Sequence, residues 1–160
     1  MIKLYRKQDG RITHYHEAWL DVSGVTEHWG PLGERGQTTE HPRKADLSEY
    51  DNLQSVLAIA TASGFLPIET EDHAVLAIEY AVNGMGSTND LDKRNALISR
   101  MDETLGWTGL GHCDGGSIGS GTMEVCCLVV DFDIAKRVIE ADLRKTTFAD
   151  YTRIYREDID

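Results

Sequence analysis

The residues best suited to chemistry gather in one glycine-rich stretch, residues 111–121. His112, Cys113 and Asp114 follow one another there and place an imidazole, a thiol and a carboxylate beside flexible backbone. These groups could form a thiol nucleophile with its base, or part of a metal site. Adjacent residues on a strand point to opposite faces, so the pattern favours a hairpin whose glycines allow a bulge or close packing. We keep His112, Cys113 and Asp114 as reactive or metal candidates and assign no catalytic residue.

Other arrangements of chemically active residues are weaker. The 111–121 stretch matches neither a Walker motif nor a dinucleotide-binding fingerprint, so it implies no nucleotide. His14 and His16 share one strand face, but no third ligand follows at a suitable spacing, which favours incidental imidazoles over a metal site. Asp131 and Asp133 could form an acid–base pair, although capping of a helix accounts for them more simply. We therefore predict no metal and no cofactor.

The cysteines indicate a reducing environment. There are three in the chain, and Cys126 and Cys127 are adjacent within an apolar stretch typical of a buried strand. Neighbours on a strand point to opposite faces, so these two are poorly placed to pair. The sequence predicts no structural disulfide and a reduced cytoplasmic protein.

Composition indicates a folded, acidic protein. Hydrophobic residues make up 41% and charged residues 27% of the 160 residues, as in ordinary globular proteins. The apolar runs are too short to cross a bilayer, and the N-terminus alternates like a strand rather than a secretion signal, so we expect a cytoplasmic location and no membrane. The net charge is -11, and residues 71–160 hold 17 acidic against 9 basic side chains. This field repels phosphate backbones and favours cationic partners.

The first half reads as a small antiparallel sheet followed by one helix. Alternation predicts strands over residues 2–7, 13–22 and 24–30, with turns at Gly10 and Ser23-Gly24, and a fourth strand over 34–40. A helix follows, for which Asn52 is the expected N-cap and Gly64 the expected end. Its apolar stripe consists of Leu53, Val56, Leu57 and Ala60.

The loop after the third strand carries the sequence Trp29-Gly30-Pro31-Leu32-Gly33-Glu34-Arg35-Gly36-Gln37. This segment resembles the motif of the WGR domain, and the likeness spans about residues 1–68. The resemblance implies an antiparallel sheet with one helix, and contact with nucleic-acid ends and neighbouring domains through Trp29, Gly30, Arg35 and Gln37. Pro31 stands where the family has arginine, which removes a donor able to grip phosphate.

Four aromatic residues of the first half could either fill the core or form a stacking platform. On strands, core packing is the commoner role, and we favour it for Trp19. For Trp29 the two roles stay open, because its loop position favours exposure. The set comprises Tyr5, Tyr15, Trp19 and Trp29.

The second half restarts with a strand over residues 73–82. A helix capped by Ser87 or Asp90 then runs to about Leu105, and a glycine-rich hairpin leads to a buried strand over 122–131. A second helix follows Asp131 or Asp133, and residues 151–155 end as a strand. This β-α-β-β-α-β order is that of the ferredoxin-like arrangement, and the region looks similar to small uncharacterised bacterial proteins. We predict an α+β fold with a WGR-like domain over 1–70 and a ferredoxin-like domain over 71–160.

Size, charge and the lack of a diagnostic catalytic motif favour a non-enzymatic binding protein. The expected partner is a protein, and a basic one suits the acidic surface; an immunity-like role fits the same features. One alternative is binding of nucleic-acid ends through the WGR-like loop, which the net charge disfavours. The other is an enzyme or metal site that uses Cys113 and His112. The sequence leaves the oligomeric state open.

Overall fold

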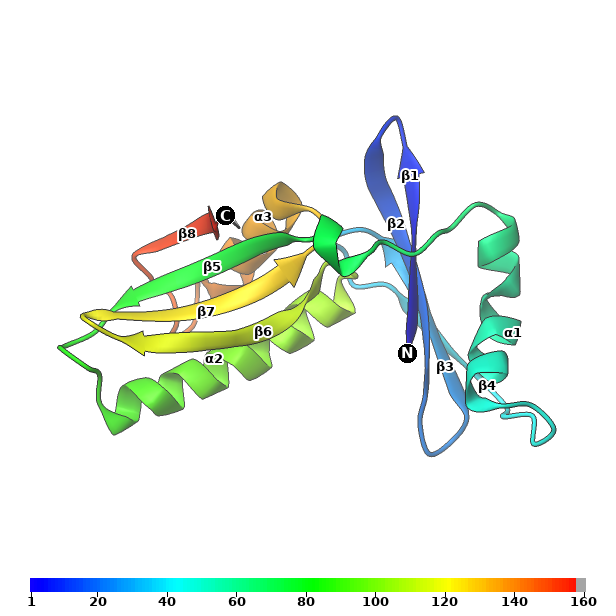
Figure 1. Ribbon diagram of the computed structural model, residues 1–160, viewed down its shortest axis with the longest axis horizontal. Helices are drawn as coiled ribbons and strands as arrows, with labels where there is room; N and C mark the ends of the chain where they lie inside the picture. Colours follow the sequence, from blue (N-terminus) through cyan, green and yellow to red (C-terminus); the bar gives the residue numbers. More distant parts are fainter. Residues whose placement is uncertain (158–160) are drawn as a thin grey trace. The chain divides into compact units, whose positions relative to one another are not determined.

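The structure, a computed structural model, describes residues 1–157 of the chain. It divides into two compact units, Met1–Glu69 and a second unit that begins at Thr70. Within residues 1–157 each unit contains one four-stranded antiparallel sheet, and three α-helices complete the chain (Figure 1). The predicted α+β class is confirmed.

The first unit is a four-stranded meander covered by one helix. Its strands are β1 (Ile2–Gln8), β2 (Arg11–Leu20), β3 (Val25–Pro31) and β4 (Gln37–His41), which lie side by side in that order. The β1–β2 turn needs only Asp9 and Gly10, both at positive φ, so β2 begins two residues earlier than predicted. Helix α1 (Glu49–Ala62) lies over one face of this sheet (Figure 1).

The core of the first unit lies between α1 and the sheet. Alternate residues of β1, β2 and β3 point toward the helix, and residues three or four apart on α1 point back toward them. Each fully buried aliphatic side chain here contributes about 1.5–3 kcal/mol of hydrophobic free energy. The cluster consists of Leu4, Ala18, Val25, Leu53, Leu57, Ala60 and Phe65.

Two boundaries of the first unit differ from the sequence prediction. Helix α1 begins after Ser48, whose hydroxyl accepts the Asp51 N–H at 3.1 Å, and not after Asn52, which is buried inside the helix. The fourth strand begins at Gln37 rather than at residue 34. The chain turns at Pro31 to Glu34, where the Glu34 N–H donates to the Pro31 carbonyl at 3.2 Å.

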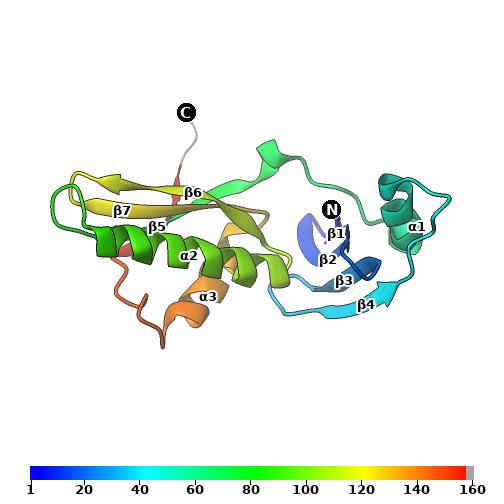
Figure 2. The same ribbon diagram turned by 90° about the horizontal axis from the view of Figure 1, so that it is seen from below.

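The second unit has the β-α-β-β-α-β order expected from the sequence. Its elements are β5 (Ala74–Ala81), α2 (Thr88–Trp107), β6 (Gly111–Gly119), β7 (Thr122–Val129), α3 (Phe132–Leu143) and β8 (Arg153–Glu157). The strands lie side by side in the order β6-β7-β5-β8. Both helices lie against one face of this sheet (Figure 2).

The helix starts of the second unit follow capping rules. Ser87 and Asp90 form a reciprocal capping box at α2, so both residues named by the sequence take part. Asp131, and not Asp133, caps α3 by accepting the Ile134 N–H at 2.9 Å. The last strand begins at Arg153, two residues later than predicted, because the N–H and hydroxyl of Thr152 both donate to the Glu79 carbonyl.

The second core is formed by alternate residues of β5 and β7 together with the inner stripes of α2 and α3. The fully buried members of this core include Leu76, Ile78, Leu97, Met101, Leu105, Met123, Val125, Cys127, Ile139 and Leu143.

Within residues 1–157, no helix is long and apolar enough to cross a membrane.

Candidate binding groove

The three reactive candidates on β6 are not brought together. His112 and Asp114 are exposed, whereas Cys113 between them is half-buried, as alternation along a strand dictates. The Cys113 N–H donates to Asp102 Oδ1 on α2 at 2.7 Å. Within the described part of the chain, no group of three or more His, Cys, Asp or Glu side chains could hold a metal ion.

Two histidines of the first sheet, His16 and His41, share one carboxylate. Glu27 lies between two imidazoles: its Oε1 is 2.6 Å from His16 Nε2, and its Oε2 is 2.6 Å from His41 Nε2. His14 instead places Nδ1 3.1 Å from the Thr13 hydroxyl. His14 and His16 therefore have separate partners and do not act as a pair.

The segment of residues 29–37, the Trp-Gly loop, is held by packing onto Tyr15. A side chain at Gly36 would collide with the Trp29 carbonyl oxygen and the Tyr15 hydroxyl, and one at Gly30 would meet the Gly36 backbone. The Tyr15 hydroxyl donates to the Glu34 carbonyl at 3.1 Å, across the turn. These two glycines of the motif thus have a structural role, because they let the turn close over Tyr15.

The side chains expected to bind through this loop differ in exposure. Trp29 lies within β3, is half-buried, and stacks on the His16 ring with 5.7 Å between centroids. Arg35 and Gln37 are exposed, while Gly30 is buried. Trp29 therefore presents only part of its surface for stacking.

A buried polar chain crosses the first sheet on the face opposite α1. Glu17 forms an ion pair with Lys3 at 2.9 Å, and its carboxylate lies 2.7 Å from His28 Nδ1. The other ring nitrogen of His28, Nε2, lies 3.0 Å from the Tyr15 hydroxyl. Burial raises the pKa of Tyr15 to about 12. The sequence does not reveal this row of hydrogen-bonded side chains, because its residues become neighbours only through strand register. Lys3 lies opposite Glu17, and Glu17 lies opposite His28.

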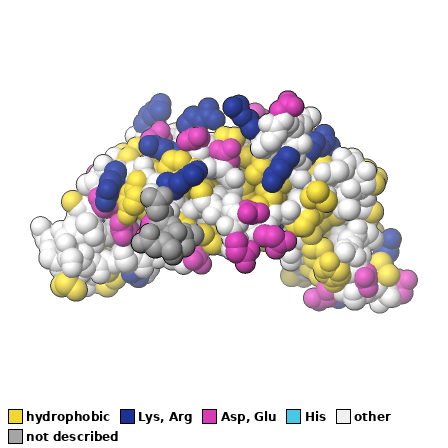
Figure 3. Space-filling model, turned by 45° about the horizontal axis from the view of Figure 1, so that its top comes forward, with side chains coloured by type: hydrophobic (Ala, Val, Ile, Leu, Met, Phe, Trp, Pro, Cys, Tyr) yellow, Lys and Arg dark blue, Asp and Glu magenta, His cyan; other side chains and the backbone are white. Residues whose placement is uncertain are grey.

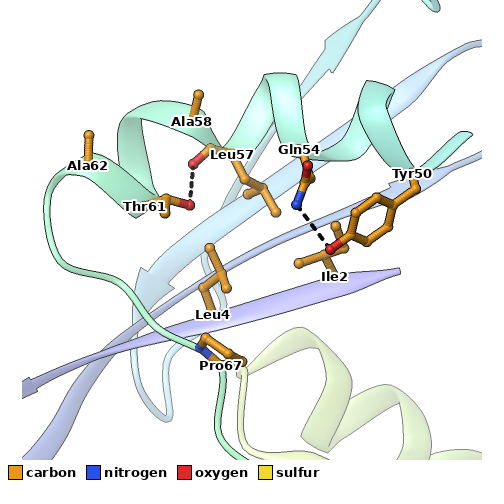
Figure 4. Close-up of a pocket in the computed structure, with 9 residues that line it drawn as sticks. All are labelled: Ile2, Leu4, Tyr50, Gln54, Leu57, Ala58, Thr61, Ala62 and Pro67. Carbon is orange, nitrogen blue, oxygen red and sulfur yellow. Dashed lines mark hydrogen bonds between the residues drawn. The ribbon is translucent and has the colours of Figure 1, made fainter. Parts of the chain in front are cut away.

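An apolar groove lies between α1 and the edge strand β1. It has a volume of about 660 Å³, and the close-up in Figure 4 shows residues of the helix and of β1 facing one another across it. The lining consists of Ile2, Leu4, Tyr50, Gln54, Leu57, Ala58, Thr61, Ala62 and Pro67.

The polar groups of this groove are largely paired with each other or with the helix. Gln54 Nε2 donates to the Tyr50 hydroxyl at 3.0 Å, and the Thr61 hydroxyl donates to the Leu57 carbonyl at 3.1 Å (Figure 4). None of the nine lining residues is Asp, Glu, His, Cys, Lys or Arg. The groove can therefore accept apolar groups but has no carboxylate, imidazole or thiol for proton transfer or nucleophilic attack.

Strand β1 also offers backbone hydrogen bonds beside the groove. Tyr5 exchanges two backbone hydrogen bonds with Leu66, at 2.8 and 2.9 Å, on the side away from β2. Backbone groups of a strand alternate in direction, so those of Lys3 point to the same outer side. Among residues 1–157 they have no backbone partner there. Lys3 therefore keeps one backbone donor and one backbone acceptor for a further hydrogen-bonded segment.

Exposed apolar side chains are also present in this unit. Tyr50, in the first turn of α1, is 59% exposed, and Leu66, shortly after the end of α1, is 64% exposed. The sequence signal that could have found the groove is the apolar content of α1 outside its core stripe, at Tyr50, Ala58 and Ala62. Such a widened stripe indicates contact beyond the unit's own sheet.

Charges on the face drawn in Figure 3 are of both signs. Lysine and arginine side chains and acidic side chains are both exposed there, and hydrophobic side chains are exposed among them.

Comparison with known proteins gives no relative: no family model, no curated protein and no solved structure matches the chain. The functional argument therefore depends on the geometry of the sites themselves.

Proposed function

We propose that this protein is a non-catalytic binding protein, and that it binds an extended segment of a protein partner in the groove between α1 and β1. The observation that carries this proposal is the apolar lining of the groove, which has no ionisable acid or base other than the Tyr50 phenol. A site of this kind gains free energy by burying apolar side chains and has no means to activate a nucleophile.

The form of the partner follows from the outward backbone N–H and C=O of Lys3, which have no backbone hydrogen-bond partner among residues 1–157. An extended segment placed beside Lys3 would gain backbone hydrogen bonds, and every second side chain of that segment would point into the groove. This mode requires apolar residues at alternate positions. The proposed ligand is therefore a strand and not a helix.

Charge argues for basic residues next to those apolar positions. Asp46, Glu49 and Asp51 are exposed around the start of α1, at the Tyr50 end of the groove. They outnumber the neighbouring basic residues, Lys44 and Arg43, and Arg43 pairs with Glu49 at 3.4 Å. The chain as a whole carries a net charge of -11. Lysine or arginine flanking the apolar segment would speed association through this field.

The proposal includes a family likeness for the fold of each unit. The glycines of the Trp-Gly loop, which close a turn over Tyr15, support a WGR-like first unit. The strand order β6-β7-β5-β8, with two helices on one face, supports a ferredoxin-like second unit. Three free thiols support a cytoplasmic location.

The test is selection of random twelve-residue peptides on the full chain, followed by titration of the selected peptides. We expect sequences with two or three apolar residues at alternate positions beside lysine or arginine. In NMR spectra the amide signals of β1 and α1 should shift most. Thr61→Trp, which fills the groove from α1, should weaken binding at least tenfold.

The matched control is Ile59→Trp on the same helix. Ile59 is 84% exposed and does not line the groove, so this variant should bind as the natural protein does. Both variants should keep the natural melting temperature within a few degrees. Peptides that bind equally well to Thr61→Trp, or that shift signals only in the second unit, would show the proposal to be wrong.

A further inference from the structure

We propose that Cys113 and Cys127 are a redox-active dithiol, which hydrogen peroxide or a related hydroperoxide converts to a disulfide between β6 and β7. The two sulfur atoms lie 3.1 Å apart although both residues are free thiols. The pair is in the second unit and does not depend on the groove of the first.

Strand register brings the two cysteines together. Cys113 on β6 is the direct antiparallel partner of Cys127 on β7. The Cys113 N–H donates to Asp102 and so points away from β7, which makes this a non-hydrogen-bonded pair. In such pairs the Cα atoms are about 4.5 Å apart and the side chains are at their closest. That separation lies within the range that a disulfide spans.

Access to the two sulfurs is unequal. Strand β6 is at the edge of its sheet, and Cys113 is half-buried, so an oxidant of the size of hydrogen peroxide reaches its sulfur first. Cys127 is fully buried beneath the helices. Cys126 points to the other face of the sheet and is opposite Gly115, so it has no thiol across from it.

The chemistry balances without any further reactant. The Cys113 sulfur attacks one peroxide oxygen, the O–O bond breaks, and Cys113 becomes a sulfenic acid while water leaves. The Cys127 sulfur then attacks the Cys113 sulfur, the S–O bond breaks, and a second water leaves with the Cys127 proton. Two thiols lose two electrons and two protons, and one peroxide is reduced to two waters.

Proton placement favours this order of steps. The hydrogen bond to Cys113 and burial both raise the pKa of Cys127, so Cys127 keeps its proton while Cys113 is the sulfur available for attack. In the second step the Cys127 proton leaves with the water released from the sulfenic acid.

The experiment treats the full reduced chain with a small excess of hydrogen peroxide, then alkylates the remaining thiols and measures intact mass. We expect the loss of two hydrogen atoms and one remaining alkylated cysteine, with full reversal by dithiothreitol. Cleavage after Glu124 should leave the two fragments joined, because the cut separates Cys113 from the other cysteines.

Three variants decide which sulfurs form the bond. Cys126→Ser, the matched control, should form the disulfide at the natural rate. Cys113→Ser should lose the disulfide, and Cys127→Ala should stop at the sulfenic acid, which dimedone traps. Because Cys127 is in the core, a melting curve checks that Cys127→Ala is folded. If it is not, Cys113→Ser, at the more exposed position, still tests whether the disulfide needs the Cys113 sulfur, and Cys126→Ser tests whether it needs Cys126. A Cys113–Cys126 bond, a dimer linked between chains, or three unreacted thiols would overturn the proposal.

Discussion

Gly36 illustrates at the scale of one residue how the Trp-Gly loop is built. A methyl group there would overlap the Trp29 carbonyl oxygen and the Tyr15 hydroxyl, and backbone atoms cannot move aside as a flexible side chain would. We expect Gly36→Ala to lower the free energy of unfolding by about 2–3 kcal/mol. Gly106 in α2 has open space at the same position. Gly106→Ala should instead stabilise by about 0.5–1 kcal/mol, and urea denaturation followed by circular dichroism compares the two. Equal effects would contradict the account.

Asp21 gives a prediction for pH. The Ser23 and Thr26 hydroxyls and nearby backbone N–H groups donate to its carboxylate and lower its pKa from 3.8 to about 2. Because the folded-state pKa is the lower one, the carboxylate stabilises the folded protein above pH 3.8 and this contribution disappears as the pH falls to about 2. Asp21→Asn should therefore unfold more easily than the natural protein at pH 5 and equally easily near pH 2.

The control for that measurement is Asp92→Asn, which removes an exposed carboxylate from α2. Its difference in urea midpoint from the natural protein should stay small across the same pH range. A gap between Asp21→Asn and the natural protein that does not change with pH would mean that titration of Asp21 is not the cause.

Some residue roles follow from sequence and others do not. The sequence limits the caps of α2 and α3 to Ser87 or Asp90 and to Asp131 or Asp133, because capping depends on neighbours along the chain. The same reasoning is wrong for α1, whose cap is Ser48 and not Asn52. Contact between Cys113 and Cys127 depends on which residue of β6 lies opposite which residue of β7. That register is shifted by a bulge after Cys113, and no local pattern fixes where the bulge falls.

The start of α1 provides a prediction at the scale of one element. Ser48 caps the helix, while the buried Asn52 side chain donates to the carbonyls of Lys44, Leu47 and Ser48 and accepts the Lys44 N–H at 2.9 Å. Removal of the cap in Ser48→Ala should cost about 1 kcal/mol. Asn52→Ala leaves several loop groups without partners and should cost about 2–3 kcal/mol. Thermal melting ranks the two variants, and the reverse order would contradict this assignment.

The order of strands and helices could be predicted, but the width of the groove could not. Alternation and helical spacing place the elements correctly, because each pattern is set within a few residues. The width of the space between α1 and β1 depends on how Leu57 and its neighbours pack on the sheet. Side-chain volumes and helix tilt decide that packing, and the periodicity of the sequence predicts neither of them.

At the scale of the whole molecule, charge makes a clear prediction about nucleic acid. With a net charge of -11, we expect no shift of DNA with exposed ends at a physiological ionic strength of about 0.15 M. Gel electrophoresis tests this, with a basic DNA-binding protein as the positive control. A shift that persists at this salt and disappears in Arg35→Glu would instead support the WGR-like loop as a nucleic-acid contact.

The bridge between Tyr5 and Leu66 has a mechanical consequence for the first unit. The two segments run antiparallel, so residues 1 and 69 leave this bridge in the same direction. A force that pulls residues 1 and 69 apart would load the two hydrogen bonds of the bridge one after the other, in unzipping geometry, and not simultaneously, in shear geometry. The segment that leads toward Thr70 would then separate from β1 under a small force, while the sheet of β1, β2, β3 and β4 stayed intact.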